Sequence, residues 1–152
     1  MYKNQNIASY LWIFSPIILG LGSSAALIPE KKIPRVRSKW NPPSWVFAVV
    51  WPILYLLLGY ASYLVWKKNG GRIECSLQNY ILHIVLLLAW WPYFVYFPNR
   101  DFATFTLFLL TIHAIYLATM FYNKNKTAGY CLVPYILWLS FATFLTSNSI
   151  NR

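Results

Sequence analysis

Five long stretches of the chain contain no Asp, Glu, Lys or Arg, and this pattern constrains the fold more than any other sequence feature. The uncharged intervals are 4–29, 40–66, 75–99, 102–123 and 127–151. As an α-helix at ~1.5 Å per residue, 44–66 would reach about 34 Å, more than the ~30 Å hydrocarbon core of a bilayer. The pattern therefore predicts five membrane-spanning helices.

The composition supports the same class of protein. Of the 152 residues, 59% are hydrophobic and only 11% are charged, and a soluble domain of this size could not cover so much apolar surface. We predict an all-α fold, an integral membrane five-helix transmembrane bundle that forms one domain over 1–152. The expected spans are approximately 7–28, 44–66, 77–97, 102–122 and 128–149, with a basic, lid-like loop over 29–43.

The positive charge indicates contact with lipid headgroups. The net charge is +10, but the thirteen Lys and Arg residues lie almost wholly between the apolar stretches, so membrane lipids are expected partners and nucleic acid is not. With five crossings these residues divide six against seven between the two sides, which leaves the orientation and the identity of the membrane open. Cys75 and Cys131 offer no disulfide framework.

Four of the five spans carry an interior proline: Pro16, Pro52, Pro92 and Pro134. Each proline removes an amide donor and frees the carbonyl four residues earlier. The freed carbonyls belong to Trp12, Ala48, Leu88 and Tyr130. Kinked helices around a central space are one expectation, and the other is that prolines are simply commoner in membrane helices.

The first span ends in small residues spaced four apart, Gly20 with Ser24 and Gly22 with Ala26. Such pairs let helix backbones approach closely in lipid. Packing within the bundle and a homodimer seam are both open.

Aromatic side chains recur at helical spacing toward the first-loop side of the bundle. Phe47, Trp51 and Tyr55 form a stripe on the second span, Leu87 and Trp90 share a face of the third, and the fifth carries Trp138, Phe141 and Ala142. Trp51, Trp90 and Thr106 all fall roughly 8–11 Å below that surface at ~1.5 Å per residue. The pattern suits a flat apolar ligand between aromatic walls, although aromatic stripes also serve packing and interface anchoring.

The two histidines are the only basic or acidic side chains inside the spans. His113 falls near the midplane, where it could ligate haem iron axially or act as a neutral hydrogen-bonding core residue. The same core role is expected for His83, which is placed nearer the opposite surface. The sequence shows no Ser-His-Asp set, paired carboxylates, phosphate-binding glycine loop or metal cluster, so hydrolytic and phosphoryl chemistry are not expected.

Two sequence blocks resemble a known family. Residues 40–55, with Trp40-Asn41-Pro42-Pro43, Phe47, Trp51 and Leu54-Tyr55, resemble the W-x-P-P-x-x-x-F-x-x-x-W-x-x-L-Y signature of the TspO/MBR family, the tryptophan-rich sensory and translocator proteins. Residues 134–143, P-Y-I-L-W-L-S-F-A-T, resemble its P-Y-x-x-W-x-x-F-A-T block, and Trp90-Trp91-Pro92 matches its third helix.

The resemblance implies a five-helix bundle whose pocket, covered by the first loop, binds haem and other porphyrins, cholesterol and benzodiazepine-type drugs. It assigns pocket roles to Trp51, Trp90, Trp138, Phe141 and Ala142, and lid roles to the segment with Trp40, Pro42 and Pro43. The shared faces and depths add Phe47, Tyr55, Leu87 and Thr106 to the expected ligand-binding residues. If the protein degrades porphyrin with light and oxygen, as similar bacterial members do, the resemblance implicates Trp51 and Trp138 as the catalytic residues.

Three polar residues of the family pattern are replaced, by Leu87, Thr106 and Thr146. A pocket without them would bind through stacking and apolar area, and the missing carboxyl-terminal sterol motif lowers cholesterol relative to porphyrin. The leading hypothesis is a receptor or sensor for tetrapyrroles, with sterols as further ligands and no obligatory cofactor. The alternatives are a porphyrin-degrading enzyme and a carrier or scaffold for sterol or porphyrin.

Overall fold

Helices form nearly all of the chain that the structure describes. This computed structural model describes residues 2–27, 40–96 and 99–148, and the side chains at 7, 9–22, 40–96 and 99–148. The helices are α1 (Tyr2–Leu27), α2 (Ser44–Lys68), α3 (Cys75–Tyr96), α4 (Arg100–Lys124), α5 (Lys126–Cys131) and α6 (Val133–Ser147). Most of the predicted lid-like loop, 28–39, lies outside the described residues.

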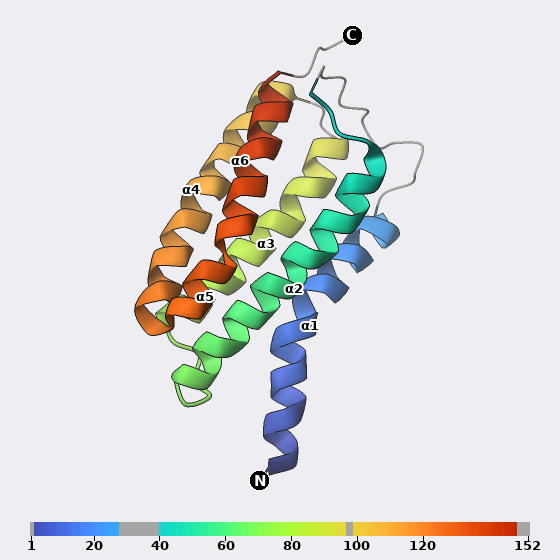
Figure 1. Ribbon diagram of the computed structural model, residues 1–152. Helices are drawn as coiled ribbons and strands as arrows, with labels where there is room; N and C mark the ends of the chain where they lie inside the picture. Colours follow the sequence, from blue (N-terminus) through green and yellow to red (C-terminus); the bar gives the residue numbers. More distant parts are fainter. Residues whose placement is uncertain (1, 28–39, 97–98, 149–152) are drawn as a thin grey trace.

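The helices pack side by side along one axis, with α1 starting at one end of the bundle and α6 finishing at the other (Figure 1). Three helices, α2, α3 and α4, and the combined segment Lys126–Ser147 are each long and apolar enough to cross a membrane, and α1 contains the shorter apolar stretch Ser9–Gly22. The prediction of an all-α membrane bundle is therefore confirmed.

The fifth span is divided at Leu132, whereas the sequence placed one continuous span at 128–149. The amide of Leu132 donates to the carbonyl of Gly129 at 3.2 Å, and its own carbonyl accepts the amide of Ile136 at 3.0 Å. Pro134 explains the division, because it is the second residue of α6, where a missing amide donor does not interrupt the hydrogen-bonding pattern. The other three interior prolines lie within unbroken helices.

The backbones of α1 and α2 touch at Gly59. A Cβ atom at this position would lie 3.0 Å from the carbonyl oxygen of Trp12 and would clash with the carbonyl of Ile13. The Trp12 carbonyl is one of those that a proline frees, here Pro16. Only glycine fits at this crossing, and α1 changes direction about half-way along its length (Figure 1).

The small residues at the end of α1 differ in their surroundings. Gly20 lies against the ring of Tyr55, so this position packs within the bundle. Among the described residues, no atom lies within 4 Å of a Cβ built on Gly22. The side chains of Ser24 and Ala26 lie outside the described residues, and a homodimer stays a prediction.

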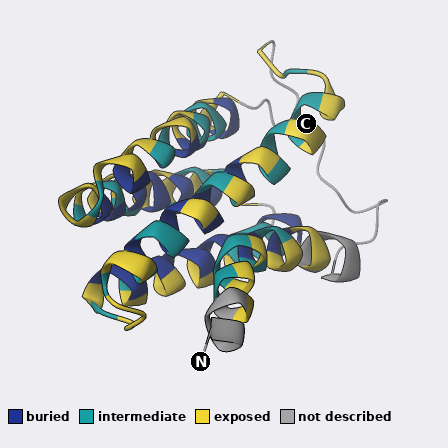
Figure 2. Cartoon of the chain, turned by 60° about the horizontal axis from the view of Figure 1, so that its bottom comes forward, coloured by how far each residue is buried: buried dark blue, intermediate teal, exposed yellow. Residues whose placement is uncertain are grey.

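The core runs along the inward faces of the helices, and the outward faces are exposed and apolar (Figure 2). The fully buried core includes Leu58, Leu77, Leu117, Phe121 and Leu139. Large apolar side chains on the outer surface include Val85, Phe105, Phe108 and Leu137, each about half exposed or more. Apolar side chains on both surfaces are expected when lipid, rather than water, surrounds the bundle.

Polar contacts fix the ends of the helices on both sides. Lys124 Nζ lies 2.6 Å from Glu74 Oε2, which joins the end of α4 to the loop before α3. The side chains of Asn99 and Asn125 cap α4 and α5, each accepting a hydrogen bond from the amide three residues later, at 3.1 Å and 3.3 Å. The connections between the spans are therefore anchored.

Candidate ligand-binding site

Five aromatic side chains from α2 and α6 meet between these helices, and we call them the aromatic cluster: Phe47, Trp51, Tyr55, Trp138 and Phe141. The rings of Trp51 and Trp138 meet edge to face, with centroids 6.5 Å apart and planes at 90°. Phe47 contacts Trp138 at 5.4 Å, Tyr55 stacks on Trp51 at 5.5 Å, and Phe141 lies 5.6 Å from Trp138. These are favourable aromatic geometries, so the rings hold one another in place.

The helical repeat explains why these residues share a face. Phe47, Trp51 and Tyr55 are spaced by four and therefore form one stripe on α2. Helix α6 packs mainly on α4, whereas α2 packs mainly on α1 and α5, and α2 and α6 make little direct backbone contact. The aromatic rings therefore bridge a seam between two spans that are otherwise supported by different neighbours.

The indole N–H of Trp138 is buried and has no hydrogen-bond partner among the described residues. A buried donor without an acceptor is destabilising by about 1–3 kcal/mol. An acceptor on a bound ligand would satisfy it. This N–H is a directed polar group in a site that is formed mainly by ring surfaces.

Trp90 lies in a different seam, between α3 and α4. Its indole Nε1 donates to the backbone carbonyl of Ala103 at 3.3 Å, and its ring stacks on Phe94 with centroids 5.1 Å apart. The sequence placed Trp90 at the same depth as Trp51, but depth does not determine which face of a helix a residue occupies. The structure brings Trp51 and Trp138 together and directs Trp90 to α4.

The three replaced polar positions hold side chains that face their own helix or the core. Leu87 lies in the core, and the hydroxyls of Thr106 and Thr146 donate to backbone carbonyls of their own helices. Leu87 is buried at 4% exposure. The hydroxyl of Thr106 donates back to the carbonyls of Phe102 and Ala103, at 2.9 and 3.0 Å. Ala142 packs half-buried against the core. Neither Leu87 nor Thr106 supplies the charge or amide that the family pattern has there.

Of the predicted lid-like loop 29–43, the structure describes only residues 40–43. Trp40 is 69% exposed, Pro42 is half-buried, and Pro43 directly precedes α2, where its carbonyl accepts the amide of Val46 at 3.0 Å. Trp40 lies at the first-loop end of α2, which is also the end nearest Phe47. Contact of these residues with a ligand stays a prediction.

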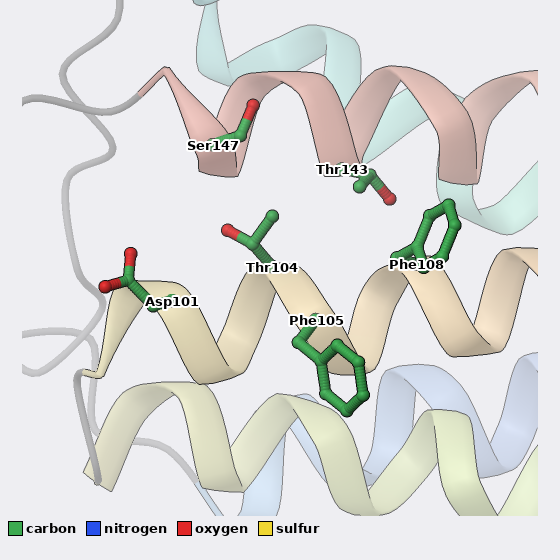
Figure 3. Close-up of a pocket in the computed structure, with 6 residues that line it drawn as sticks. All are labelled: Asp101, Thr104, Phe105, Phe108, Thr143 and Ser147. Atoms are coloured by element: carbon green, nitrogen blue, oxygen red, sulfur yellow. The ribbon is translucent and has the colours of Figure 1, made fainter.

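A groove of about 370 Å³ lies on the outer side of the bundle between α4 and α6. It is lined by Asp101, Thr104, Phe105, Phe108, Thr143 and Ser147 (Figure 3). None of the predicted ligand-binding residues lines this groove, and no sequence pattern predicted it. Its polar end is formed by Asp101 and Ser147, and its phenylalanines are half exposed on the outer surface.

The two histidines form one hydrogen-bonded group with a tyrosine, which sequence reasoning missed. His83 Nδ1 lies 2.9 Å from His113 Nδ1, and His83 Nε2 lies 2.7 Å from the hydroxyl of Tyr135. One signal was available, because the midpoint between positions 83 and 113 falls between α3 and α4, which are consecutive helices. Ligation of haem iron by His113 stays a prediction, and its Nδ1 is already engaged with His83.

The fold and the site define an integral, multi-pass membrane protein with an aromatic site between two of its spans. A sequence model of the TspO/MBR family matches residues 13–150. The chain therefore belongs to the TspO/MBR family.

Several curated proteins are similar to this chain. The translocator protein of Homo sapiens is 37% identical over 112 residues, which cover 72% of this chain and 66% of that protein. The tryptophan-rich protein TspO of Chlorobaculum tepidum is 32% identical over 114 residues, covering 72% of this chain and 71% of that protein. The translocator protein homolog of Schizosaccharomyces pombe is 33% identical over 113 residues, covering 72% and 69%. The match thus spans slightly less than two thirds of the human protein's own length.

Proposed function

We propose that the protein is a membrane receptor or sensor that binds porphyrins against the aromatic cluster. The observation that supports this proposal is the contact of Trp51 with Trp138 across the seam between α2 and α6. A flat macrocycle could exchange this edge-to-face contact for stacking on both indoles, which are contributed by different helices.

The chemistry of the site favours a ligand with a large apolar face and a few acceptors. Asp, Glu, Lys and Arg are absent from 44–66 and from 127–151, which include the aromatic cluster, so binding would depend on ring area. The unpartnered indole N–H of Trp138 would donate to a ring substituent such as a propionate. Because α2 and α6 have separate supports, they could move apart to admit the ring.

A titration of the purified protein in detergent with protoporphyrin tests this proposal, with tryptophan fluorescence as the readout. We expect saturable quenching. Trp51→Phe and Trp138→Phe should each weaken the affinity by about 2- to 10-fold, the equivalent of ~0.5–1.5 kcal/mol for an aromatic pair. Trp45→Phe is the matched control, because Trp45 is 66% exposed, and it should leave the affinity unchanged. Quenching that never saturates would contradict the proposal.

A second candidate is light- and oxygen-dependent breakdown of the porphyrin. It is favoured by the same pair of indoles, because two tryptophans in ring contact could share the charge left when one donates an electron to an excited ligand. In this case the protein holds the ligand beside Trp51 and Trp138 and excludes water from the site. The porphyrin would be a substrate and not a resident cofactor.

Illumination separates the two candidates. The porphyrin complex should lose its visible absorbance faster than the same porphyrin in empty detergent micelles, and only in the light and in the presence of oxygen. The double variant W51F/W138F should reduce this excess rate. A complex that bleaches no faster than free porphyrin would identify a receptor without this activity.

A further inference from the structure

A tyrosine and two histidines form a continuous hydrogen-bonded chain through the middle of the bundle. Tyr135 comes from α6, His83 from α3 and His113 from α4, with contacts of 2.7 Å and 2.9 Å. Tyr135 and His83 are both fully buried, and His113 is partly exposed. The chain therefore leads from the interior of the bundle toward its outer surface.

The distances determine how protons can be arranged. Two Nδ1 atoms at 2.9 Å need one hydrogen between them, so one imidazole donates and the other accepts. If Tyr135 donates to His83 Nε2, then His83 Nδ1–H donates to His113 Nδ1, and the hydrogen of neutral His113 lies on Nε2, at the partly exposed end of the chain. The opposite arrangement would leave the Tyr135 hydroxyl hydrogen without an acceptor in this group. We therefore assign the direction from Tyr135 to His113.

The tyrosine end of this chain lies beside the aromatic cluster. Tyr135 precedes Trp138 by three residues on α6, which is nearly one helical turn. Trp138 in turn meets Trp51 of α2 edge to face, with ring centroids 6.5 Å apart. The phenol is thus about one helical turn from the tryptophan that joins α6 to α2.

We propose that Tyr135, His83 and His113 form a proton-coupled electron relay that reduces an oxidised tryptophan of the aromatic cluster. The first oxidant is a photoexcited porphyrin, and this part rests on the second candidate function above. The porphyrin takes one electron from Trp138 and leaves an indole radical cation. Tyr135 then returns one electron to Trp138, and its phenolic proton passes to His83 Nε2. The proton on His83 Nδ1 passes to His113 Nδ1, which leaves a neutral tyrosyl radical, a neutral His83 and a positively charged His113.

Two features of the structure support this assignment. The positive charge ends on His113, which is partly exposed, and not on the fully buried His83, where an unpaired charge would be far less favourable. The indole N–H of Trp138 has no acceptor among the described residues, so its radical cation has no protein group to take its proton, whereas Tyr135 has one. No Asp or Glu occurs in 75–99, 102–123 or 127–151 to replace the imidazoles as bases.

Flash photolysis of the ligand-free protein tests the relay without any porphyrin. Ultraviolet pulses ionise tryptophan directly, and transient absorption distinguishes the indole radical from the tyrosyl radical. We expect a fast phase in which the indole signal decays as the tyrosyl signal appears, slowed in deuterated water. Tyr135→Phe should abolish this phase, while Tyr130→Phe, at a tyrosine that is 62% exposed, should leave it intact.

His83→Gln tests the proton acceptor, because an amide can keep a hydrogen bond to Tyr135 but is not a base. We expect this phase to slow by about 100-fold, the lower end of what a positioned base contributes, and to lose its deuterium effect. A fast phase that survives Tyr135→Phe would overturn the relay, and one unaffected by His83→Gln would overturn the role of the histidines. If the fast phase is present but the protein does not accelerate porphyrin bleaching, the enzymatic candidate is contradicted and the relay is still supported. Circular dichroism of each variant checks that the bundle is folded.

Discussion

Trp12 and Gly59 meet through their backbones, with the carbonyl of one against the Cα of the other. The carbonyl of Ile13 comes closer still, and both approaches depend on Gly59, which has no side chain to hold the helices apart. Pro16 removes the amide that would otherwise bond to the Trp12 carbonyl, so one of the two carbonyls at this crossing lacks its usual helical donor.

Gly59→Ala should destabilise the protein. The added methyl group would collide with the carbonyl of Ile13, and overpacking of this kind typically costs about 1–3 kcal/mol. Unfolding in detergent, followed by circular dichroism, measures the change. Gly22→Ala is the matched control, because no described atom lies within 4 Å of its Cβ position, and it should be neutral or slightly stabilising. Equal effects of the two substitutions would contradict the close α1–α2 crossing.

Trp90→Phe should lower mainly the stability of the protein, whereas Trp138→Phe should lower mainly its porphyrin affinity. Trp90→Phe removes the hydrogen bond to Ala103, so we expect it to lower the unfolding free energy by about 1 kcal/mol beyond the loss of ring area, with little effect on porphyrin affinity. Trp138→Phe removes a donor that has no partner in the described protein, so it should affect affinity more than stability. Parallel melting curves and fluorescence titrations of the two variants separate these outcomes. Similar profiles would mean that the two tryptophans share one site.

His83 and His113 should be energetically coupled. His83→Leu removes the hydrogen-bond partner of both His113 and Tyr135, and His113→Leu removes the same contact with His83. Part of the loss in unfolding free energy should therefore be common to the two substitutions. We expect a double-mutant cycle on unfolding free energy to give a coupling of roughly 0.5–3 kcal/mol. The pair His113→Leu with Glu74→Gln, in which Glu74 contacts the end of α4, serves as the control and should be additive. Additivity of the two histidine substitutions would show that the contact contributes nothing.

The ion pair of Glu74 with Lys124 should contribute little to the unfolding free energy. Both side chains are more than 40% exposed, and exposed pairs typically contribute about 0–1 kcal/mol. Glu74→Gln should therefore lower the unfolding free energy by less than about 1 kcal/mol, and the difference should shrink in high salt. Melting curves at two salt concentrations measure it. A larger, salt-independent loss would indicate that this contact is shielded from water.

The fold class could be predicted from the sequence because charge is excluded from a bilayer interior. The absence of Asp, Glu, Lys and Arg over five intervals is sufficient to predict the membrane bundle. The stripe of Phe47, Trp51 and Tyr55 could be predicted as well, since helical spacing fixes which residues share a face.

Helical spacing does not predict which neighbouring helix each of these faces packs against. Trp90 has the depth of Trp51, yet it bonds to α4, because the rotation of each helix is set by packing that sequence spacing does not contain. The pairing of His83 with His113 depends on the same rotation. The division at Leu132 follows from Pro134, but the three other interior prolines leave their helices unbroken, so proline alone does not predict a break.

The division at Leu132 has a consequence for how the bundle responds to its membrane. Helices α5 and α6 both pack on α4, but α5 also packs on α2, whereas α6 makes little backbone contact with α2. A helix adapts to a thinner or thicker bilayer by changing its tilt, and a change in the tilt of α6 would be opposed least on the side that faces α2. Because α6 carries Trp138, hydrophobic thickness would set the spacing between the indoles, and the same chain would respond differently to its ligand in bilayers of different lipid length.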